Sequence, residues 1–398
     1  MKCAVVNAGV IVSGDLRKPF IEGDTVIMHD GAIAAVGDAA AAQVDECEVV
    51  VDAAGATVAP GLIDSHVHIT FGDYTPRQQT VGYLESYLYG GTTTSISASE
   101  VHVPGRPSDR DGVKALAVAA HKSFQSYRPG GMTVHAGSII LEPELRPEDL
   151  ADVARQGVWL AKAGFGAFAS PYDYAPLIAA ARANGMVTTV HTGGSSIPGS
   201  GAITGDHLLA LDPHVSFHVN GGPTAMPDPH FAMLVRESSI ALQVCTAGNL
   251  RTTLLCAQLL EEAGALDRLL IATDTPTGSG IMPLGMLYTI SHLASLGRLS
   301  PEQAICAATG NVARVYGLRS GVLAAGCLAD VVILDAPAGG TQQDALAALA
   351  HGDVAAVAAV ITDGVPRFVG RSRNTPAPSR PVKVARWELP HRFLGGPA

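Results

Sequence analysis

Eight short apolar, β-branched runs alternate with segments of helical period between residues 58 and 318. The helical segments include residues 113–127, 176–184 and 254–263. Strands joined through helices in one sheet run parallel, so this alternation predicts an α/β fold with a parallel sheet. A count of eight predicts a closed (β/α)8 TIM barrel. The runs occupy residues 58–68, 92–97, 132–140, 158–163, 186–191, 214–219, 239–245 and 269–274.

The two ends of the chain have a different texture, with short β-branched strands separated by turn signals. Residues 24–28 and 48–51 are of this kind, and the same pattern returns after residue 320 at 329–335 and 357–361. Neither end is long enough for a stable sheet alone. We therefore predict three parts. Residues 1–57 plus 320–370 form a small composite β-sandwich domain, 58–319 form the barrel, and the Pro-rich 371–398 form an extended C-terminal tail.

Composition and charge narrow the classes of partner. Hydrophobic residues make up 47% of the 398 residues, which excludes global disorder, and the net charge of −10 argues against nucleic acid or an anionic membrane. Six scattered cysteines are not a disulfide framework, which favours a cytoplasmic location. No apolar run approaches the roughly 18 residues of a membrane span. We expect a small-molecule substrate as the partner.

Histidines stand at the ends of several predicted strands. His66 and His68 are two positions apart, so on a strand their side chains share one face. A His-x-His pair or a lone strand-end histidine is more often a core or surface residue than a ligand. His191, His218 and Asp274 end other predicted strands, however, and the carboxyl ends of all barrel strands meet at one face. The set therefore predicts a metal centre, and its donors suit zinc, iron or manganese.

Lys162 stands alone in the apolar fourth run. A buried lysine is rare unless it is paired, because desolvation disfavours the ammonium. One interpretation is a lysine that reaches solvent or forms a salt bridge. The other is a neutral amine that captures carbon dioxide, giving a carbamate that bridges two metal ions. Its position favours the carbamate, because a bridging anion is needed between the histidine pairs.

Two segments carry a family resemblance. The run Pro60-Gly61-Leu62-Ile63-Asp64-Ser65-His66-Val67-His68, and the later residues 321–330, resemble the amidohydrolase superfamily. Within it, several loop motifs resemble cyclic-amide hydrolases of the enamidase type. Those hydrolases place a glutamate where this chain has Lys162. The matching motifs are residues 72–78, 104–107, 191–200, 220–225, 283–285 and 372–376.

The resemblance implies a role for each ligand. His66, His68 and Asp274 would bind the more buried of two divalent metal ions, and His191 and His218 would bind the second. Carbon dioxide bound as a carbamate on Lys162 would bridge the two ions, with a shared hydroxide opposite. This metal-bridging hydroxide would attack the carbon of a C–N bond in a cyclic amide or enamide, including a ring that carries a carboxylate. Asp274 would move the proton to the leaving nitrogen. Zinc is the first choice of metal, followed by iron or manganese.

The sequence signals for substrate-binding residues are less specific than those for the metal ligands. Arg77 and Arg106 lie in loops on the predicted catalytic face, where an arginine fork binds a carboxylate or simply stabilises its loop. Asn220, Asn249 and Thr277 are candidate hydrogen-bonding groups by position.

Alternatives to a cyclic-amide hydrolase remain open. A deaminase or a linear N-acyl amide hydrolase of the same superfamily is the second choice. A non-catalytic relative acting as an assembly module is the remote one, since such relatives usually lose ligands that are all present here. By analogy with related barrels we expect a homo-oligomer, with a tetramer as the model.

Overall fold

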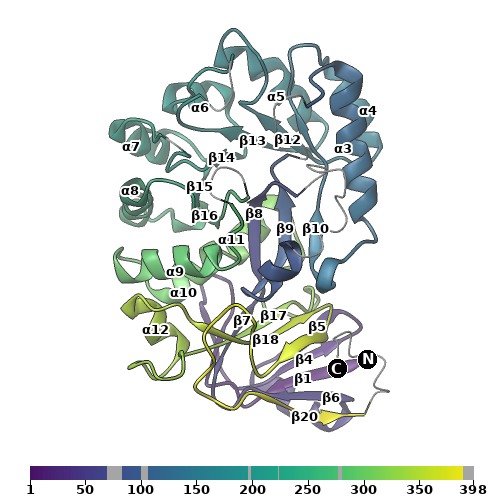
Figure 1. The fold of residues 1–398 in the computed structure, drawn as a ribbon, viewed down its shortest axis with the longest axis vertical. Coiled ribbons are helices and arrows are strands. Elements are labelled where there is room, and N and C mark those ends of the chain that lie inside the picture. The colour runs from purple at the N-terminus through teal and green to yellow at the C-terminus, as the bar shows by residue number, and fades with distance from the viewer. Residues whose placement is uncertain (70–82, 100–105, 196–198, 223, 277–279, 389–398) are drawn as a thin grey trace.

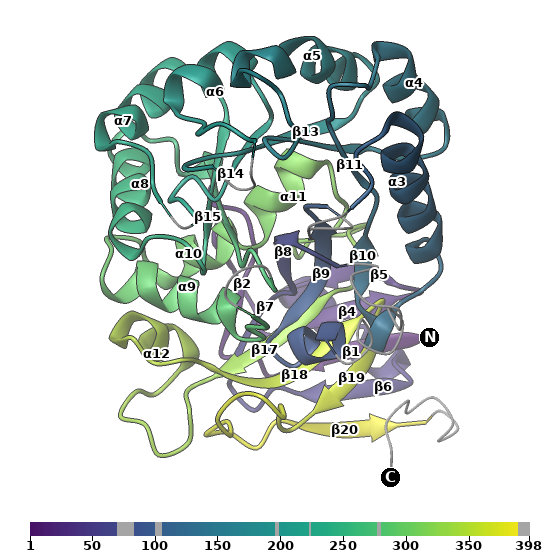
Figure 2. The same cartoon turned by 45° about the horizontal axis from the view of Figure 1, so that its top comes forward.

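The structure is a computed structural model that describes residues 1–69, 83–99, 106–195, 199–222, 224–276 and 280–388. Its larger part is a barrel of parallel strands surrounded by helices (Figures 1 and 2). The eight predicted runs all contain barrel strands; the third run forms two short strands. They are β8 (Leu62–Val67), β9 (Thr92–Ser97), β10 (Thr133–His135), β11 (Ser138–Ile140), β12 (Leu160–Ala163), β13 (Val187–His191), β14 (Val215–Phe217), β15 (Ala241–Cys245) and β16 (Leu269–Ala272).

The first and last barrel strands lie side by side, which closes the barrel. The strand orders are β10-β9-β8 and β11-β12-β13-β14-β15-β16. A parallel bridge joins Val67 to Thr275, and the amide of Asp274 donates to the carbonyl of His66 at 3.0 Å. The predicted (β/α)8 barrel is confirmed. This closure also places the residues after β8 and β16 next to each other.

Helices cover the outside of the barrel. Side chains at helix starts satisfy amides that have no partner within the helix. Asp109 accepts from the amide of Gly112, and Asn249 accepts from Thr252. None of the described helices is long and apolar enough to cross a membrane. The outer helices are α3 (Arg110–Phe124), α4 (Pro147–Arg155), α5 (Ala175–Ala183), α6 (Gly205–Leu211), α7 (Asp228–Glu237), α8 (Leu250–Glu262), α9 (Gly285–Ser295) and α10 (Pro301–Ala307). The helix α11 (Gly310–Tyr316) instead packs against residues from several barrel strands and lies within the ring of outer helices (Figure 2).

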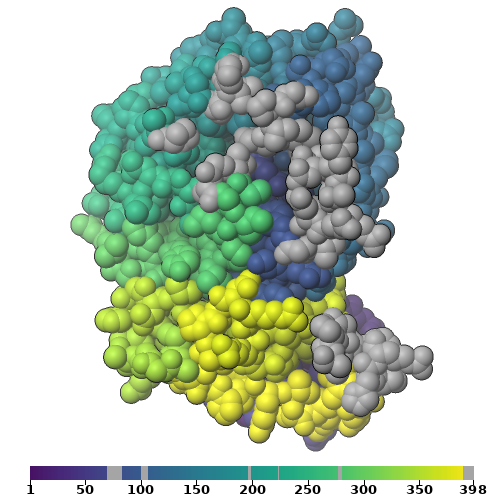
Figure 3. All heavy atoms as spheres, in the orientation of Figure 1, coloured from purple at the N-terminus to yellow at the C-terminus, as the bar shows by residue number. Residues whose placement is uncertain are grey.

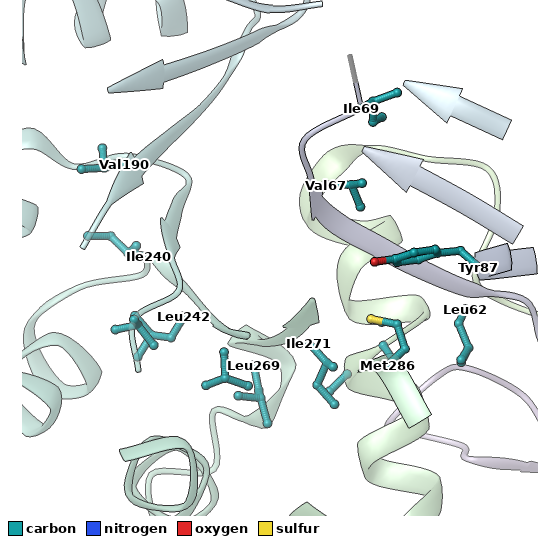
Figure 4. Close-up of a cluster of buried hydrophobic side chains, with 14 of the residues drawn as sticks. Leu62, Val67, Ile69, Tyr87, Val190, Ile240, Leu242, Leu269, Ile271 and Met286 are labelled. Carbon is teal, nitrogen blue, oxygen red and sulfur yellow. The ribbon is translucent and has the colours of Figure 1, made fainter. Parts of the chain in front are cut away.

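The main hydrophobic core lies between the barrel strands and the helices. Leu242, Leu269 and Ile271 from the last strands belong to the same buried cluster as Met286 of α9 and Tyr87 (Figure 4). Burial of such side chains stabilises the fold by roughly 1.5–3 kcal/mol each relative to exposure. The strands that carry the site are therefore anchored from behind.

Both ends of the chain build a β-sandwich below the barrel, as the sequence predicts (Figure 1). One sheet has the order β20-β6-β1-β4-β5 and the other β19-β18-β17-β7-β2-β3. Alternation along β1 sends Cys3 and Val5 into the core between the sheets. The strands are β1 (Lys2–Val6), β2 (Val10–Val12), β3 (Phe20–Ile21), β4 (Val26–His29), β5 (Ala32–Val36), β6 (Val49–Asp52), β7 (Thr57–Pro60), β17 (Val331–Asp335), β18 (Ala356–Thr362), β19 (Val365–Val369) and β20 (Lys383–Trp387).

The predicted run 58–68 is two strands rather than one. Its first residues belong to β7, which pairs with β17 in the sandwich, whereas β8 enters the barrel. Gly61 joins them, and a Cβ at this position would lie 2.1 Å from Oγ1 of Thr93. Only glycine lets the chain pass this close to β9.

The Pro-rich segment after residue 370 runs along the sandwich, and its residues 383–387 pair antiparallel with β6 as β20. In Figure 3 the yellow C-terminal residues cover much of the visible face of the sandwich. The sequence pattern did not predict this strand, because exposed edge residues show no apolar run. All six cysteines are free, in agreement with the absence of a disulfide framework.

Candidate active site

One half of the site is built where β8 and β16 meet. Nε2 of His66 lies 3.0 Å from Oδ1 of Asp274, and Nε2 of His68 lies 3.3 Å from the same oxygen. The three residues each offer one ligand atom, and these atoms lie within 4.8 Å of one another. Two imidazole nitrogens converging on one carboxylate oxygen suit a divalent cation.

Burial sets the charge of these groups. It lowers the pKa of His66, and it lowers the pKa of His68 to about 4, so both imidazoles are neutral near pH 7. Burial alone would raise the pKa of Asp274, but the adjacent His66 and His68 hold it well below its usual value. Neutral imidazoles and an ionised carboxylate are the forms that bind metals.

The other half of the site is a pair of histidines on neighbouring strands. Nδ1 of His191, at the end of β13, lies 3.1 Å from Nε2 of His218, which follows β14. The opposite nitrogens face carbonyl oxygens, because Nε2 of His191 lies 2.7 Å from the oxygen of Gly194 and Nδ1 of His218 lies 3.1 Å from that of Thr192. Carbonyls only accept hydrogen bonds, so these opposite nitrogens carry the protons.

The two facing nitrogens therefore present lone pairs to each other. Burial lowers the pKa of His191 to about 4 and that of His218 well below its ordinary value, so a proton does not occupy the space between them near pH 7. Two facing lone pairs repel each other unless a cation binds both. The ring of His218 also lies 5.2 Å from that of His66, which joins the two halves of the site.

Lys162 on β12 contacts two rings, and each ring adjoins one half of the site: Phe217 lies against His66, and Phe165 lies against His191. Its side chain is fully buried, and its Nζ has no hydrogen-bond partner among the described residues. The amine lies 4.6 Å from the ring centroid of Phe165 and 5.1 Å from that of Phe217. Burial lowers the pKa of Lys162 to about 8. The salt-bridged or solvent-reaching alternative does not fit a buried amine without a described partner.

Further residues contact the candidate ligands, and the sequence analysis missed them. Nδ1 of His66 lies 2.8 Å from Oε1 of Gln243, whose Nε2 donates to the hydroxyl of Ser65 at 2.8 Å. Nδ1 of His68 lies 3.1 Å from the hydroxyl of Ser99. Gln243 is a polar residue within an apolar strand, and that anomaly is the signal that identifies it.

The segment that carries Asp274 is fixed from both sides. Asp64 is fully buried and accepts from the amide of Thr273 at 3.0 Å, while Tyr83 donates to the carbonyl of Thr275 at 3.1 Å. Burial raises the pKa of Asp64 to about 7, although the hydrogen bonds that Asp64 accepts from Thr273 and His66 oppose the change. Asp64 therefore acts as a structural acceptor below Asp274.

The five predicted substrate contacts have different surroundings. Arg77 and Thr277 lie outside the described residues. The Arg106 guanidinium forms an ion pair of 2.6 Å with Glu142, and Asn249 caps α8. The side chain of Asn220 exchanges hydrogen bonds of 3.0 Å with the backbone of Cys245. Direct contact of any of the five with a substrate stays a prediction.

Replacing Gln243 with leucine is expected to weaken metal binding by about 10–100-fold, because His66 loses the acceptor that fixes its tautomer and ring orientation. Dialysis against graded chelator, followed by metal analysis, measures this change. Gln258→Leu, at a partly exposed position of α8, is the matched control and should bind metal as the wild type does. Equal metal retention by both variants would contradict the orienting role of Gln243.

Acylation of the Lys162 amine in metal-free protein is expected to rise with pH around a midpoint near 8. Only the neutral amine is nucleophilic, and burial lowers the pKa of Lys162 to about 8, whereas an ordinary lysine titrates near 10.4. Pulse labelling with acetic anhydride and peptide mass spectrometry measures the profile. The exposed Lys383 in the same digest corrects for decay of the reagent. A midpoint above 10 would show that the amine is solvated.

Comparison with known proteins settles the family. Residues 57–367 match the sequence model of the Amidohydrolase family. The chain belongs to the amidohydrolase family. The resemblance carried by the motif that ends in His66 and His68 is thereby confirmed, and the chain is a hydrolase acting on carbon–nitrogen bonds.

Relatives of this amidohydrolase include an enamidase, imidazolonepropionases and adenine deaminases. The enamidase of Eubacterium barkeri is 42% identical over 384 residues, which are 96% of this chain and 99% of that protein. An imidazolonepropionase of Salinispora tropica is 27% identical over 78% of this chain and 86% of its own length. An adenine deaminase of Bradyrhizobium is 26% identical over 71% of this chain and 46% of its own length.

A solved structure agrees with the sequence relationship. The crystal structure of enamidase matches this fold with a TM-score of 0.91 at 42% identity, covering 96% of this chain and 100% of that one. The amidohydrolase described here therefore shares both its barrel and its sandwich arrangement with enamidase.

Proposed function

We propose that this amidohydrolase hydrolyses the C–N bond of a cyclic amide or enamide with the help of two divalent metal ions. The observation that carries the proposal is the convergence of four buried neutral histidines, an ionised aspartate and an unpartnered lysine amine at one end of the barrel. The 42% identity to enamidase over nearly the whole chain supports the ring substrate.

The residues present fit such a metal pair. His66, His68 and Asp274 would hold one ion, because their ligand atoms already converge. The facing lone pairs of His191 and His218 would hold the other. Zinc suits these donors best, and iron or manganese would also bind them.

Lys162 would supply the bridge after reaction with carbon dioxide. The Nζ lone pair adds to the carbon of CO2, one N–H proton passes to water, and a carbamate with one negative charge results. This reaction would give a buried amine that has no partner among the described residues two acceptor oxygens, which could bind metal ions. A deeply buried amine with a pKa of about 8 is neutral often enough at neutral pH to react.

The protein groups then account for the proton transfers of hydrolysis. A metal pair, when bound, lowers the pKa of a shared water and polarises the substrate carbonyl. Asp274 takes a proton from the attacking water and returns it to the ring nitrogen as the C–N bond breaks. The water oxygen becomes part of the new carboxylate, so the ring opens without any redox change.

A deaminase is the second candidate, because an adenine deaminase is among the relatives at 26% identity. A linear N-acyl amide hydrolase would use the same groups. A non-catalytic assembly module is disfavoured, because all six predicted ligands are present.

A hydrolysis screen of metal-loaded protein tests the proposal. Lactams, cyclic imides, hydantoins and tetrahydro-oxonicotinate-like compounds are compared with exocyclic amines and linear N-acyl amides. We expect ring opening, together with about two transition-metal ions per chain by elemental analysis. Ammonia release from exocyclic amines alone would replace the proposal with the deaminase. Protein that retains no metal after purification without chelator would contradict the metal centre.

A further inference from the structure

We infer that the Arg106–Glu142 ion pair is a positioning couple that holds the Phe165 ring over the Lys162 amine. The inference rests on the proposed function, in which Lys162 carries the bridging group. It gives Arg106 a role other than the substrate contact that its loop position suggested.

The ion pair between Arg106 and Glu142 is buried. Nη2 of Arg106 lies 2.6 Å from Oε1 of Glu142, and the two side chains are 9% and 2% exposed. The same Nη2 donates to the carbonyl oxygen of Phe165 at 2.7 Å. The guanidinium stays charged and keeps its planar shape, so it can donate to this carbonyl while its charge is balanced by Glu142. Arg106 thus connects Glu142 directly to the backbone that follows β12.

The segment after β12 is pressed against the site. Gly164 has φ of +96°, and a Cβ there would lie 2.5 Å from Cβ of His191. Two residues further, Gly166 donates to the hydroxyl of Tyr174 at 2.8 Å and accepts from it at 2.9 Å. The amide of Ala167 lies 3.4 Å from Oε2 of Glu142. Arg106, Glu142 and Tyr174 therefore fasten the short segment that contains Phe165.

The Phe165 side chain extends from this fastened segment to the site. Its ring centroid is 4.6 Å from Nζ of Lys162, and the Phe165 and His191 rings form a T-shaped contact with a centroid distance of 5.6 Å. The ring thus covers the reactive amine and supports one of the proposed ligands. An aromatic cover excludes water from the amine, whereas a displaced ring would expose it.

Accessibility of the amine in metal-free protein gives a test that needs no activity. Pulse acylation with acetic anhydride at one fixed pH, followed by peptide mass spectrometry, should label Lys162 about 10-fold faster in Arg106→Lys and in Glu142→Gln, a change typical of losing an orienting partner. Phe165→Ala should give the same increase. Arg110→Lys is the matched control, because Arg110 forms a 2.7 Å ion pair with the equally buried Asp149 away from the site. Thermal unfolding of each variant checks that it is folded.

Coupling separates positioning from substrate binding. If Arg106 acts through Phe165, the double variant Arg106→Lys/Phe165→Ala labels no faster than Phe165→Ala alone. Additive labelling, or unchanged labelling in Arg106→Lys, overturns the inference. A rise in KM confined to carboxylate-bearing substrates, with unchanged labelling, would instead make Arg106 a substrate contact. Faster labelling in a protein that opens no ring would contradict the proposed function while leaving the positioning couple intact.

Discussion

Lys162→Met is expected to abolish hydrolysis while making the metal-free protein more stable. Methionine keeps the volume of the buried side chain and removes an amine that has no hydrogen-bond partner among the described residues. Leaving such a group unpaired costs about 1–3 kcal/mol, so the variant should gain roughly that amount in free energy of unfolding. Activity should fall on the order of 10³-fold or more, because the charge that balances the metal ions is lost.

The stability gain has a defined pH dependence. The folded pKa of Lys162 is lowered to about 8, so the folded state binds its proton less readily than the unfolded chain does. The part of the penalty that comes from burying the charge is complete below pH 8 and disappears as pH rises from 8 to about 10.4, the ordinary lysine pKa. The difference in melting temperature between variant and wild type should therefore shrink across this window.

Calorimetry of the metal-free proteins and a ring-opening assay of the loaded proteins check this pair of effects. Lys114→Met is the matched control, since Lys114 lies 3.0 Å from Asp149 and 2.8 Å from Asp152 on the outer helices. It should lose stability and keep its activity. A short carboxylic acid added to Lys162→Ala should restore part of the activity by replacing the bridging anion. Full activity and full metal content in Lys162→Met would refute the bridge.

The barrel and the placement of the candidate ligands could be predicted from the sequence because both follow from local pattern. Eight β-branched runs with intervening helices specify a closed parallel sheet, and a strand-end residue such as His218 must then lie at the common carboxyl end. The pairing of β20 with β6 could not be predicted, because an edge strand is held by backbone hydrogen bonds that leave no side-chain pattern.

Contacts between segments far apart in the sequence could not be predicted from the local sequence pattern either. Gln243 reaches His66 across a separation of 177 residues, and only the closed barrel brings them together. The pattern left two roles open for Arg106, a carboxylate contact or stabilisation of its loop, because its partner Glu142 comes from a different loop. Local sequence therefore identifies the candidate site residues more readily than the distant residues that position them.

Asp274→Asn is expected to lower kcat by about 10²–10⁴-fold, the usual contribution of a general acid–base group. The amide keeps the shape of the side chain, but it cannot accept the proton of the attacking water. It also removes the negative charge on which His66 and His68 converge, so metal affinity at that half of the site should fall as well.

Backbone strain does not account for this expected loss, because Asp274 has φ of +59° and asparagine tolerates that left-handed conformation at least as well as aspartate. Asp363→Asn is the matched control, since Asp363 has φ of +51° in the turn between β18 and β19, away from the site. Measuring kcat at saturating metal distinguishes loss of the proton acceptor from loss of metal affinity in Asp274→Asn. If the aspartate carries the proton, saturating metal will restore metal content without restoring kcat. Recovery of full kcat at high metal concentration would show that Asp274 is a ligand alone, and the proton would then have to leave through another group.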